Sequence, residues 1–440
     1  MILTKEKKYI CENIARDSEG ELTFAGKNLT SLAKKYGTPL YLYDEERIRE
    51  RCRTYLSAVK ESFDGKGKVL YASKAASFKR LYEIMKEEGM GIDVVSRGEI
   101  YTAYRAGFPL SKAYFHSNNK TDEDVEYAME YGVGYFVADN VEELYAIEKL
   151  AAEKGITQKI LLRITPGIDP HTYAAVATGK VDSKFGSAIE TGQAYDITRV
   201  ALSLPHISLR GFHCHVGSQV FDSDVYMRAS DVMLDFVFTV YEGLGYLADE
   251  LDIGGGYGVR YIDSQPEIDI SKNIKTVAEF MKSKAASLGI TMPEVAFEPG
   301  RSIVADAGMT LYTVGTVKRI PGYKSYVSVD GGMTDNPRYA LYGSPYTILP
   351  VSGKHTEESD NVSVVGRCCE SGDILQENIP MPKDIKRGDL IACLTTGAYH
   401  YSMASNYNRI PRPPVVMLNG EGDRLAVRRE SAEDLSLFDI

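Results

Sequence analysis

The stretch Lys68–Gly107 reads KVLYASKAASFKRLYEIMKEEGMGIDVVSRGEIYTAYRAG and shows the repeating pattern on which the fold depends. A short apolar run is followed by a helix-like segment, and both recur from Gly91 onward. Ser96 and Glu99 form a possible capping box, which is typical of a helix start. The same alternation continues as far as residue 298, and it predicts a series of βα units.

Eight apolar runs in this region are strand candidates: Lys68–Ala72, Gly91–Val95, Ala113–His116, Gly134–Ala138, Lys159–Thr165, Arg210–His215, Leu251–Gly254 and Glu294–Glu298. Eight βα units over roughly 250 residues are typical of a (β/α)8 barrel of the TIM type. A doubly wound open sheet is the alternative. The count of eight favours the barrel.

The pattern changes after residue 300, where helix-like stretches become few. Gly, Pro and Asp separate β-like runs at Met309–Lys318, Ser325–Asp330, Asn361–Val365, Leu390–Thr395 and Val415–Leu418. Such runs predict a second, all-β domain of the sandwich or barrel kind. We expect the α/β barrel to cover residues 37–298, and residues 1–36 and 299–440 to form the β-domain.

The composition restricts the classes of function. The apolar fraction of 44 % and the formal charge of −10 are typical of a soluble globular protein and argue against broad nucleic-acid binding, which needs clustered Lys and Arg. No apolar run reaches the ~18–20 residues of a membrane helix, and residues 1–21 lack the apolar core of a signal peptide. The six cysteines show neither metal spacing nor a dense disulfide framework. We therefore expect a cytoplasmic protein with no nucleic-acid or membrane partner.

Polar residues follow the predicted strands, at the end of a barrel where active sites lie. Lys74 comes directly after the first strand, and a partly desolvated lysine can form a Schiff base with a carbonyl group. For a single lysine, extension into solvent is the more common alternative. The run Gly254–Gly256 would let backbone N–H groups approach a phosphate, although it matches neither a dinucleotide fingerprint nor a P-loop. A simple turn is the alternative for this run.

Two further strand ends carry candidate functional groups. His213 and His215 form an H-x-H pair, which holds zinc in some barrel hydrolases. A metal site needs further His and carboxylate ligands, and this chain has only seven histidines, so we expect no metal. Glu298 could keep a pyridine nitrogen protonated, which makes the ring an electron sink. An ordinary ion pair in a surface turn is the alternative. An amine, an imidazole, a glycine-rich loop and a carboxylate at one barrel rim form a more specific signal than any of them alone.

These segments resemble the fold-type III pyridoxal 5'-phosphate (PLP) decarboxylases, a barrel-plus-β-domain family that includes ornithine, arginine and diaminopimelate decarboxylases. The resemblance is carried by Tyr71–Lys74, Ser183–Gly186, His213–Ser218, Glu298–Arg301 and Gly397–Tyr399. It implies that PLP is the cofactor and that Lys74 binds it covalently. It also implies that the other cofactor-binding residues are Asp93, His116, His215, Ser218, Gly254, Gly255, Gly256, Glu298, Gly300, Arg301 and Tyr399.

Three segments resemble the diaminopimelate branch of the family: Asp335–Arg338 with Ala340–Gly343, Cys369–Ser371, and Tyr399–Met403 with Ser405–Asn408. The resemblance implies decarboxylation of meso-2,6-diaminopimelate to L-lysine and CO2, with Cys369 as the catalytic acid. It implies that the substrate is bound by Arg301, Arg338, Tyr342, Glu370 and Tyr399. Two residues depart from the family's common pattern: Tyr339 stands where proline is frequent, and His400 stands where glycine is frequent.

The resemblance further implies a homodimer with shared active sites, because in this family the loop that bears the cysteine reaches the PLP of the partner subunit. Three other functions stay open. A sibling decarboxylase would act on carboxynorspermidine, ornithine or arginine. A metal hydrolase would use the same barrel. A non-catalytic PLP-binding homologue would have no turnover, although the presence of both Lys74 and Cys369 argues against it.

Overall fold

A computed structural model describes residues 9–168 and 182–440, and these residues form two compact units. The barrel unit contains Arg51–Gly258 and Ile268–Ser302. The β unit contains Met1–Glu50, Val259–Glu267 and Ile303–Ile440. The chain therefore enters the β unit first, crosses the barrel, returns briefly near residue 260, and finishes in the β unit.

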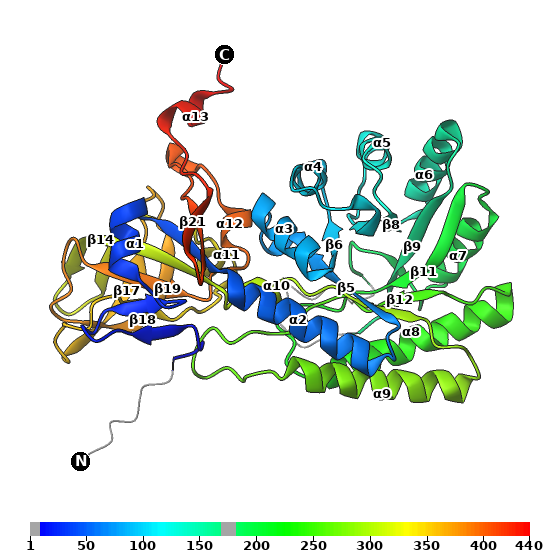
Figure 1. The fold of residues 1–440 in the computed structure, drawn as a ribbon, viewed down its shortest axis with the longest axis horizontal. Coiled ribbons are helices and arrows are strands. Elements are labelled where there is room, and N and C mark those ends of the chain that lie inside the picture. The colour runs from blue at the N-terminus through cyan, green and yellow to red at the C-terminus, as the bar shows by residue number, and fades with distance from the viewer. Residues whose placement is uncertain (1–8, 169–181) are drawn as a thin grey trace. The chain divides into compact units, whose positions relative to one another are not determined.

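The barrel unit is built on parallel strands that occur in the order predicted from the sequence (Figure 1). They are β5 (Gly67–Ala72), β6 (Gly91–Val94), β7 (Ala113–Phe115), β8 (Tyr135–Ala138), β9 (Gln158–Thr165), β11 (Ile207–His213), β12 (Glu250–Asp252) and β13 (Glu294–Phe297). Each pairs with the next, β13 pairs with β5, and β8 pairs with β9. The ring is thus closed, which confirms the predicted barrel and excludes the open sheet. A short strand, β10 (Ser187–Ala188), pairs with β9 outside the ring.

Helices alternate with these strands and lie outside them in the barrel unit (Figure 1). They are α2 (Glu45–Ser62), α3 (Lys79–Glu88), α4 (Arg97–Arg105), α5 (Asp122–Glu130), α6 (Val141–Lys154), α7 (Gln193–Ser203), α8 (Ser223–Leu244) and α9 (Ile270–Leu288). The Ser96 hydroxyl accepts a hydrogen bond from the Glu99 backbone N–H, as the sequence pattern predicts for the start of α4. The Glu99 carboxylate accepts the N–H of Val95, one residue earlier than an ideal capping box requires.

Side chains fill the barrel interior near the N-terminal ends of the strands. Lys68 pairs with Glu250 at 2.6 Å, and the Tyr114 hydroxyl donates a hydrogen bond to the same carboxylate at 2.8 Å. Leu70 and Leu161 pack together in the apolar cluster next to this group. A barrel filled at this end has its functional groups at the other end, where the strands terminate.

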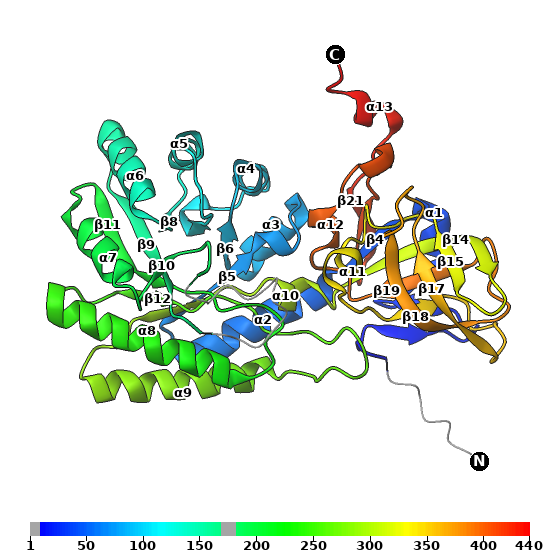
Figure 2. The same cartoon turned by 180° about the vertical axis from the view of Figure 1, so that it is seen from behind.

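The β unit is organised around one large sheet with the strand order β18-β17-β15-β14-β4-β20-β21, to which β19 and β16 are attached (Figure 2). Its strands are β4 (Leu40–Asp44), β14 (Gly308–Arg319), β15 (Ser325–Val329), β16 (Ile348–Pro350), β17 (Ser359–Val365), β18 (Ile374–Pro382), β19 (Leu390–Leu394), β20 (Val415–Asn419) and β21 (Gly422–Val427). A small sheet contains β1 (Ile14–Arg16), β2 (Leu22–Phe24) and β3 (Lys27–Asn28). This mixed sheet is the second domain that the sequence indicates.

Short helices complete the β unit: α1 (Leu29–Tyr36), α11 (Arg338–Tyr342), α12 (His400–Met403) and α13 (Ala432–Ser436). Buried Leu40 and Leu42 of β4 pack with Leu311 of β14 and Val416 of β20 in the core of the unit. The apolar run at residues 40–44 therefore contributes to this sheet, where β4 pairs with both β14 and β20.

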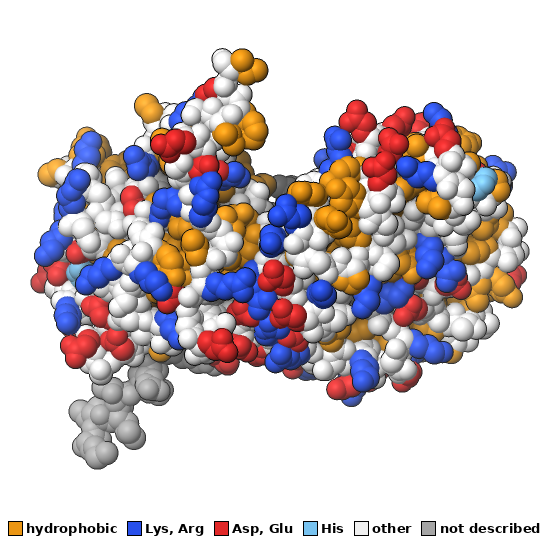
Figure 3. Space-filling view, turned by 45° about the horizontal axis from the view of Figure 1, so that its top comes forward, with side chains coloured by type: hydrophobic (Ala, Val, Ile, Leu, Met, Phe, Trp, Pro, Cys, Tyr) orange, Lys and Arg blue, Asp and Glu red, His pale blue; other side chains and the backbone are white. Residues whose placement is uncertain are grey.

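The described helices include none with the length and apolar character that a membrane crossing requires. Figure 3 shows Lys and Arg side chains interspersed with Asp and Glu over the face that it draws. Interspersed charge of both signs agrees with the modest net charge of −10.

Candidate active site

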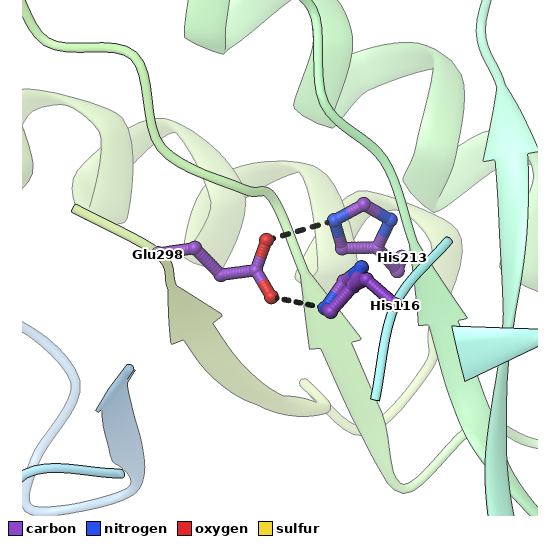
Figure 4. A group of neighbouring side chains, drawn as sticks. All are labelled: His116, His213 and Glu298. Atoms are coloured by element: carbon purple, nitrogen blue, oxygen red, sulfur yellow. Dashed lines mark hydrogen bonds and ion pairs between the residues drawn. The ribbon is translucent and has the colours of Figure 1, made fainter. Parts of the chain in front are cut away.

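Three buried polar side chains meet at the C-terminal ends of the barrel strands (Figure 4). His116 follows β7, His213 ends β11 and Glu298 follows β13. The two oxygens of Glu298 lie 2.7 Å from His116 Nε2 and 3.0 Å from His213 Nε2. Three strands that are distant in sequence thus place one carboxylate between two imidazoles.

This arrangement keeps Glu298 ionised. Burial opposes the charge, but His116 and His213 hold the pKa of the Glu298 carboxyl well below its usual range. Burial in turn lowers the pKa of His213. Asp93, which lies at the end of β6, has its pKa raised to about 6 by burial. The site therefore contains one carboxylate that stays charged, Glu298, and a second carboxyl, Asp93, whose pKa is raised.

Lys74 lies in the turn Ser73–Ala75 directly after β5, and its side chain is exposed at the rim. Its amine is close enough to shift the pKa values of side chains at the neighbouring strand ends. Burial is the main cause that lowers the pKa of His215 well below its usual value, and the Lys74 charge adds to this effect. The same charge counteracts the effect of burial on the pKa of Asp93. Lys74, Asp93 and His215 therefore belong to one electrostatic environment.

The glycine run after β12 allows close approach of backbone to backbone. A Cβ atom at Gly255 would lie 2.0 Å from the carbonyl oxygen of Glu298, and one at Gly256 would lie 2.1 Å from that of Gly217. At Gly254, which has a φ of +72°, a Cβ atom would lie 2.8 Å from His215 Nδ1. Any other residue would push these strand ends apart, so the glycines place residues 254–256 beside the imidazole and the carboxylate.

A cation lies next to this run. The buried guanidinium of Arg301 donates hydrogen bonds to the Ser218 hydroxyl from Nε at 3.1 Å and from Nη2 at 2.8 Å. The preceding residue, Gly300, packs closely against the end of β5, because a Cβ atom there would come within 2.9 Å of the Ala72 side chain. A guanidinium, a hydroxyl and a glycine-rich backbone are the donors that suit a phosphate group.

Two residues at the site were not identified from the sequence. Arg163, near the end of β9, lies with its guanidinium 4.2 Å from the centre of the Phe185 ring, and the carboxylates of Asp139 and Glu298 counteract the effect of burial on its pKa. Asp252 at the end of β12 is fully buried and accepts the N–H of Gly254 at 2.7 Å. The signal that could have found both is a charged side chain near the end of an apolar strand.

The β unit holds a second group of the predicted residues. The Arg338 guanidinium is buried and donates hydrogen bonds to the hydroxyls of Tyr346 at 2.7 Å, Tyr261 at 3.3 Å and Ser344 at 3.3 Å. It also lies 5.5 Å and 5.9 Å from the ring centres of Tyr399 and Tyr342. Among the residues that the structure describes, no carboxylate lies within ion-pair distance of this cation.

Cys369 and Glu370 lie in the loop between β17 and β18 of the β unit, and both are exposed. The Cys369 N–H donates a hydrogen bond to the Asn408 side chain at 2.9 Å. The Glu370 carboxylate accepts the N–H of Gly372 at 3.2 Å. These two residues therefore belong to a different unit from Lys74 and Glu298.

The chain matches a family model described as "Pyridoxal-dependent decarboxylase, pyridoxal binding domain" over residues 45–305. The chain belongs to this family. It is 42 % identical to the diaminopimelate decarboxylase of Bacillus subtilis over 97 % of this chain and 96 % of that protein. A solved structure of diaminopimelate decarboxylase from M. jannaschii in complex with L-lysine matches with a TM-score of 0.90 and 32 % identity, and covers 98 % of this chain and 99 % of that one.

A more distant relative is the lysine/ornithine decarboxylase of Vibrio vulnificus, solved in complex with putrescine. It matches with a TM-score of 0.74 and 25 % identity, over 89 % of this chain and 97 % of that one. The likeness is thus closer to the diaminopimelate enzymes than to this decarboxylase of basic amino acids.

The residues at the barrel rim fit the PLP cofactor of the family. The observation that tests the fit is the buried polar set itself. Asp93 Oδ1 has no hydrogen-bond partner among the described residues, and the Arg301 guanidinium donates two hydrogen bonds to the Ser218 hydroxyl. An exposed amine at Lys74 suits the aldehyde, ionised Glu298 suits the pyridine nitrogen, and Ser218 with Arg301 suits the phosphate. The chemistry of this donor set is complete for PLP.

Proposed function

We propose that this chain decarboxylates meso-2,6-diaminopimelate to L-lysine and CO2. The observation that carries the proposal is the environment of Arg338, a buried cation whose described hydrogen-bond partners are neutral hydroxyls. A buried charge without a counter-ion is costly, and a carboxylate from a ligand would supply the missing partner. Family membership and the names of the most similar relatives support the same substrate.

The distal end of meso-diaminopimelate carries one carboxylate and one ammonium group. In the proposed site, the planar guanidinium of Arg338 binds the carboxylate, and the rings of Tyr342 and Tyr399 border the guanidinium. Glu370 binds the ammonium group, and Arg301 lies at the cofactor side. Ornithine and lysine have only the ammonium group, so they would leave the cation without a partner, and such a site rejects them strongly.

The barrel residues perform the other part of the reaction. Lys74 would hold the cofactor through its amine, and the His215 imidazole would pack against the cofactor ring. When bound, PLP supplies an electron sink for the electron pair that remains after CO2 departs. Ionised Glu298 keeps the proton on the ring nitrogen, and Asp93 and His116 support the site. Cys369 donates the proton that ends the reaction.

We also infer a homodimer in which Cys369 and Glu370 complete the site of the partner subunit. The support is the family resemblance, together with their exposure in a unit separate from Lys74. A two-fold dimer uses the same surface on both chains, so it would form two such mixed sites. The cytoplasmic location expected from the sequence stays a prediction.

The competing function is a metal hydrolase, and one feature of the site supports it. One donor atom each from His116, His213 and Glu298 lies within 4.8 Å of the others, which is a spacing that a metal ion could use. Zinc in a catalytic site takes three such ligands. The PLP-family membership and the amine of Lys74 at the same rim favour the decarboxylase.

Replacing Arg338 with glutamine is expected to raise the KM for meso-diaminopimelate and to leave the inhibition constant of L-lysine nearly unchanged. L-lysine lacks the distal carboxylate, so it does not use the guanidinium. A hydrogen bond to a charged group contributes about 1.5–3 kcal/mol, which corresponds to roughly 10- to 150-fold in kcat/KM. Steady-state kinetics with both compounds measures the difference.

The matched control is Arg319→Gln, which removes a half-exposed arginine at the end of β14 and should change neither constant. If Arg338→Gln weakens the binding of L-lysine as much as the binding of meso-diaminopimelate, the arginine does not recognise the distal carboxylate.

Replacing Glu298 with glutamine is expected to lower kcat by roughly 10- to 150-fold, the equivalent of about 1.5–3 kcal/mol for one charge-assisted hydrogen bond, with a smaller change in KM. Glutamine keeps the shape but cannot hold the ring nitrogen protonated, and this interaction matters most as charge develops in the transition state. Glu294→Gln, at the opposite end of the same strand, is the control. An unchanged kcat in Glu298→Gln would remove Glu298 from this role.

A further inference from the structure

His400 departs from the pattern of the family that the chain resembles, where glycine is frequent at this position. The residue follows Tyr399 directly and begins α12 of the β unit. Its side chain is completely buried, with an exposed fraction of 0 %. A histidine that replaces a residue without a side chain must fill space and find polar partners in the core.

The first contact of His400 leads to the start of the helix that carries Arg338. His400 Nε2 lies 2.7 Å from the side-chain oxygen of Asn336, and the imidazole N–H donates this hydrogen bond. Asn336 is itself fully buried, and its backbone N–H donates to the carbonyl of Gly332 at 2.8 Å. Pro337 and then Arg338 follow in the chain. The imidazole therefore holds the residue that lies two positions before α11.

The second contact leads to the guanidinium itself. The rings of His400 and Tyr346 meet edge to face, with centres 5.0 Å apart and planes inclined by 83°. The Tyr346 hydroxyl accepts the shortest hydrogen bond that Arg338 donates, at 2.7 Å. On its other side, His400 is covalently joined to Tyr399, whose ring lies 5.5 Å from the same guanidinium. All these residues belong to the β unit.

We propose that His400 is a positioning residue that fixes the Arg338 guanidinium for the distal carboxylate of the substrate. It acts on both ends of the side chain: through Asn336 it fixes the backbone where α11 starts, and through Tyr346 it fixes the hydroxyl that binds Nη1. This inference rests on the proposed function, because the distal carboxylate is the group that Arg338 binds. His400 thereby determines specificity for the substrate over the product, which lacks that carboxylate.

The hydrogen bond and the ring contact predict different effects, so two substitutions separate them. His400→Gln keeps an N–H donor at about the reach of Nε2 but removes the ring. His400→Phe keeps a ring against Tyr346 but removes the donor, which leaves the buried Asn336 oxygen without this bond. His400→Gly removes both. Tyr339→Phe is the matched control. It removes a hydroxyl from the same helix, α11, and this hydroxyl donates a hydrogen bond to Glu377 at 3.3 Å.

The experiment uses the full-length, PLP-loaded protein and measures the KM for meso-diaminopimelate, the inhibition constant of L-lysine and the thermal midpoint. We expect a roughly three- to ten-fold rise in KM for His400→Gly and His400→Phe, the range of one lost neutral hydrogen bond. We expect His400→Gln to raise the KM less than either of these two, because it loses only the ring contact with Tyr346. We expect Tyr339→Phe to stay within about two-fold of the unchanged protein. The inhibition constant of L-lysine should stay within about two-fold in all four variants.

A fall in thermal midpoint with an unchanged KM in His400→Gly and His400→Phe would overturn the proposal, since His400 would then only fill space. An equal loss of affinity for L-lysine and substrate would overturn it as well. If His400→Gly does not fold, the comparison of His400→Phe with His400→Gln decides the question. A failure of the unchanged protein to form L-lysine refutes the proposed function, whereas normal L-lysine formation with identical KM values in every variant refutes only the role of His400.

Discussion

Lys74→Ala is expected to abolish both steady turnover and the visible absorbance of protein-bound PLP. The amine lies in the turn after β5, at the rim where His215, Glu298 and Arg301 gather, and it is the group there that can bind the cofactor aldehyde. Without it, the cofactor is no longer attached covalently or released to the substrate amine. The absorbance spectrum after dialysis and the rate of CO2 release measure the two effects.

Lys79→Ala is the control for this substitution. Lys79 is an exposed lysine at the start of α3, five positions along the chain, and its loss should change neither the spectrum nor the rate. A Lys74→Ala protein that retains the native spectrum and normal turnover after dialysis would show that the cofactor is bound elsewhere.

Mixing two inactive variants is expected to restore about a quarter of the original activity. Lys74→Ala and Cys369→Ala should each be nearly inactive alone. If the two residues of one site come from different chains of a two-fold dimer, each mixed dimer has one site with both defects and one with neither. Random exchange makes about half of the dimers mixed, and half of their sites are intact, which gives the quarter.

The control for mixing replaces the Cys369→Ala chain with a chain that carries both substitutions. Mixed dimers of that chain with Lys74→Ala have no intact site, so no activity should return. A mass label on one chain confirms that subunits have exchanged. If exchange is complete and the activity stays at the level of the single variants, each chain builds its own site and the shared site is ruled out.

The barrel was predictable from the sequence because each strand is a short apolar run and each connection carries helix signals. The predicted positions of the strand ends were less exact. His116, His215 and Glu298 were placed inside predicted strands, yet β7, β11 and β13 end before them. Apolar periodicity cannot locate the residue at which strand pairing stops, because the polar residues that follow point into the same barrel end. These residues are among those that we propose to carry the chemistry.

The site was predictable where motifs are local and less so where it is assembled from distant segments. The residues at strand ends follow from barrel topology. The surroundings of Arg338 do not, since Tyr261, Ser344, Tyr346 and Tyr399 come from three parts of the chain. The two histidines on Glu298 were also missed as its partners, because their contact depends on which faces of β7 and β11 turn inward. Sequence spacing carries no information on such contacts.

Product analysis with a panel of amino acids tests whether this chain performs PLP-dependent decarboxylation of meso-diaminopimelate. The PLP-loaded protein is given meso-diaminopimelate, ornithine, arginine, lysine and carboxynorspermidine separately, and products are identified by mass spectrometry with and without prior treatment with a metal chelator. We predict that meso-diaminopimelate alone is consumed efficiently, with one L-lysine formed per CO2 and no effect of the chelator. If ornithine or lysine is an equally good substrate, or if the chelator abolishes the activity, the chain is not a PLP-dependent diaminopimelate decarboxylase.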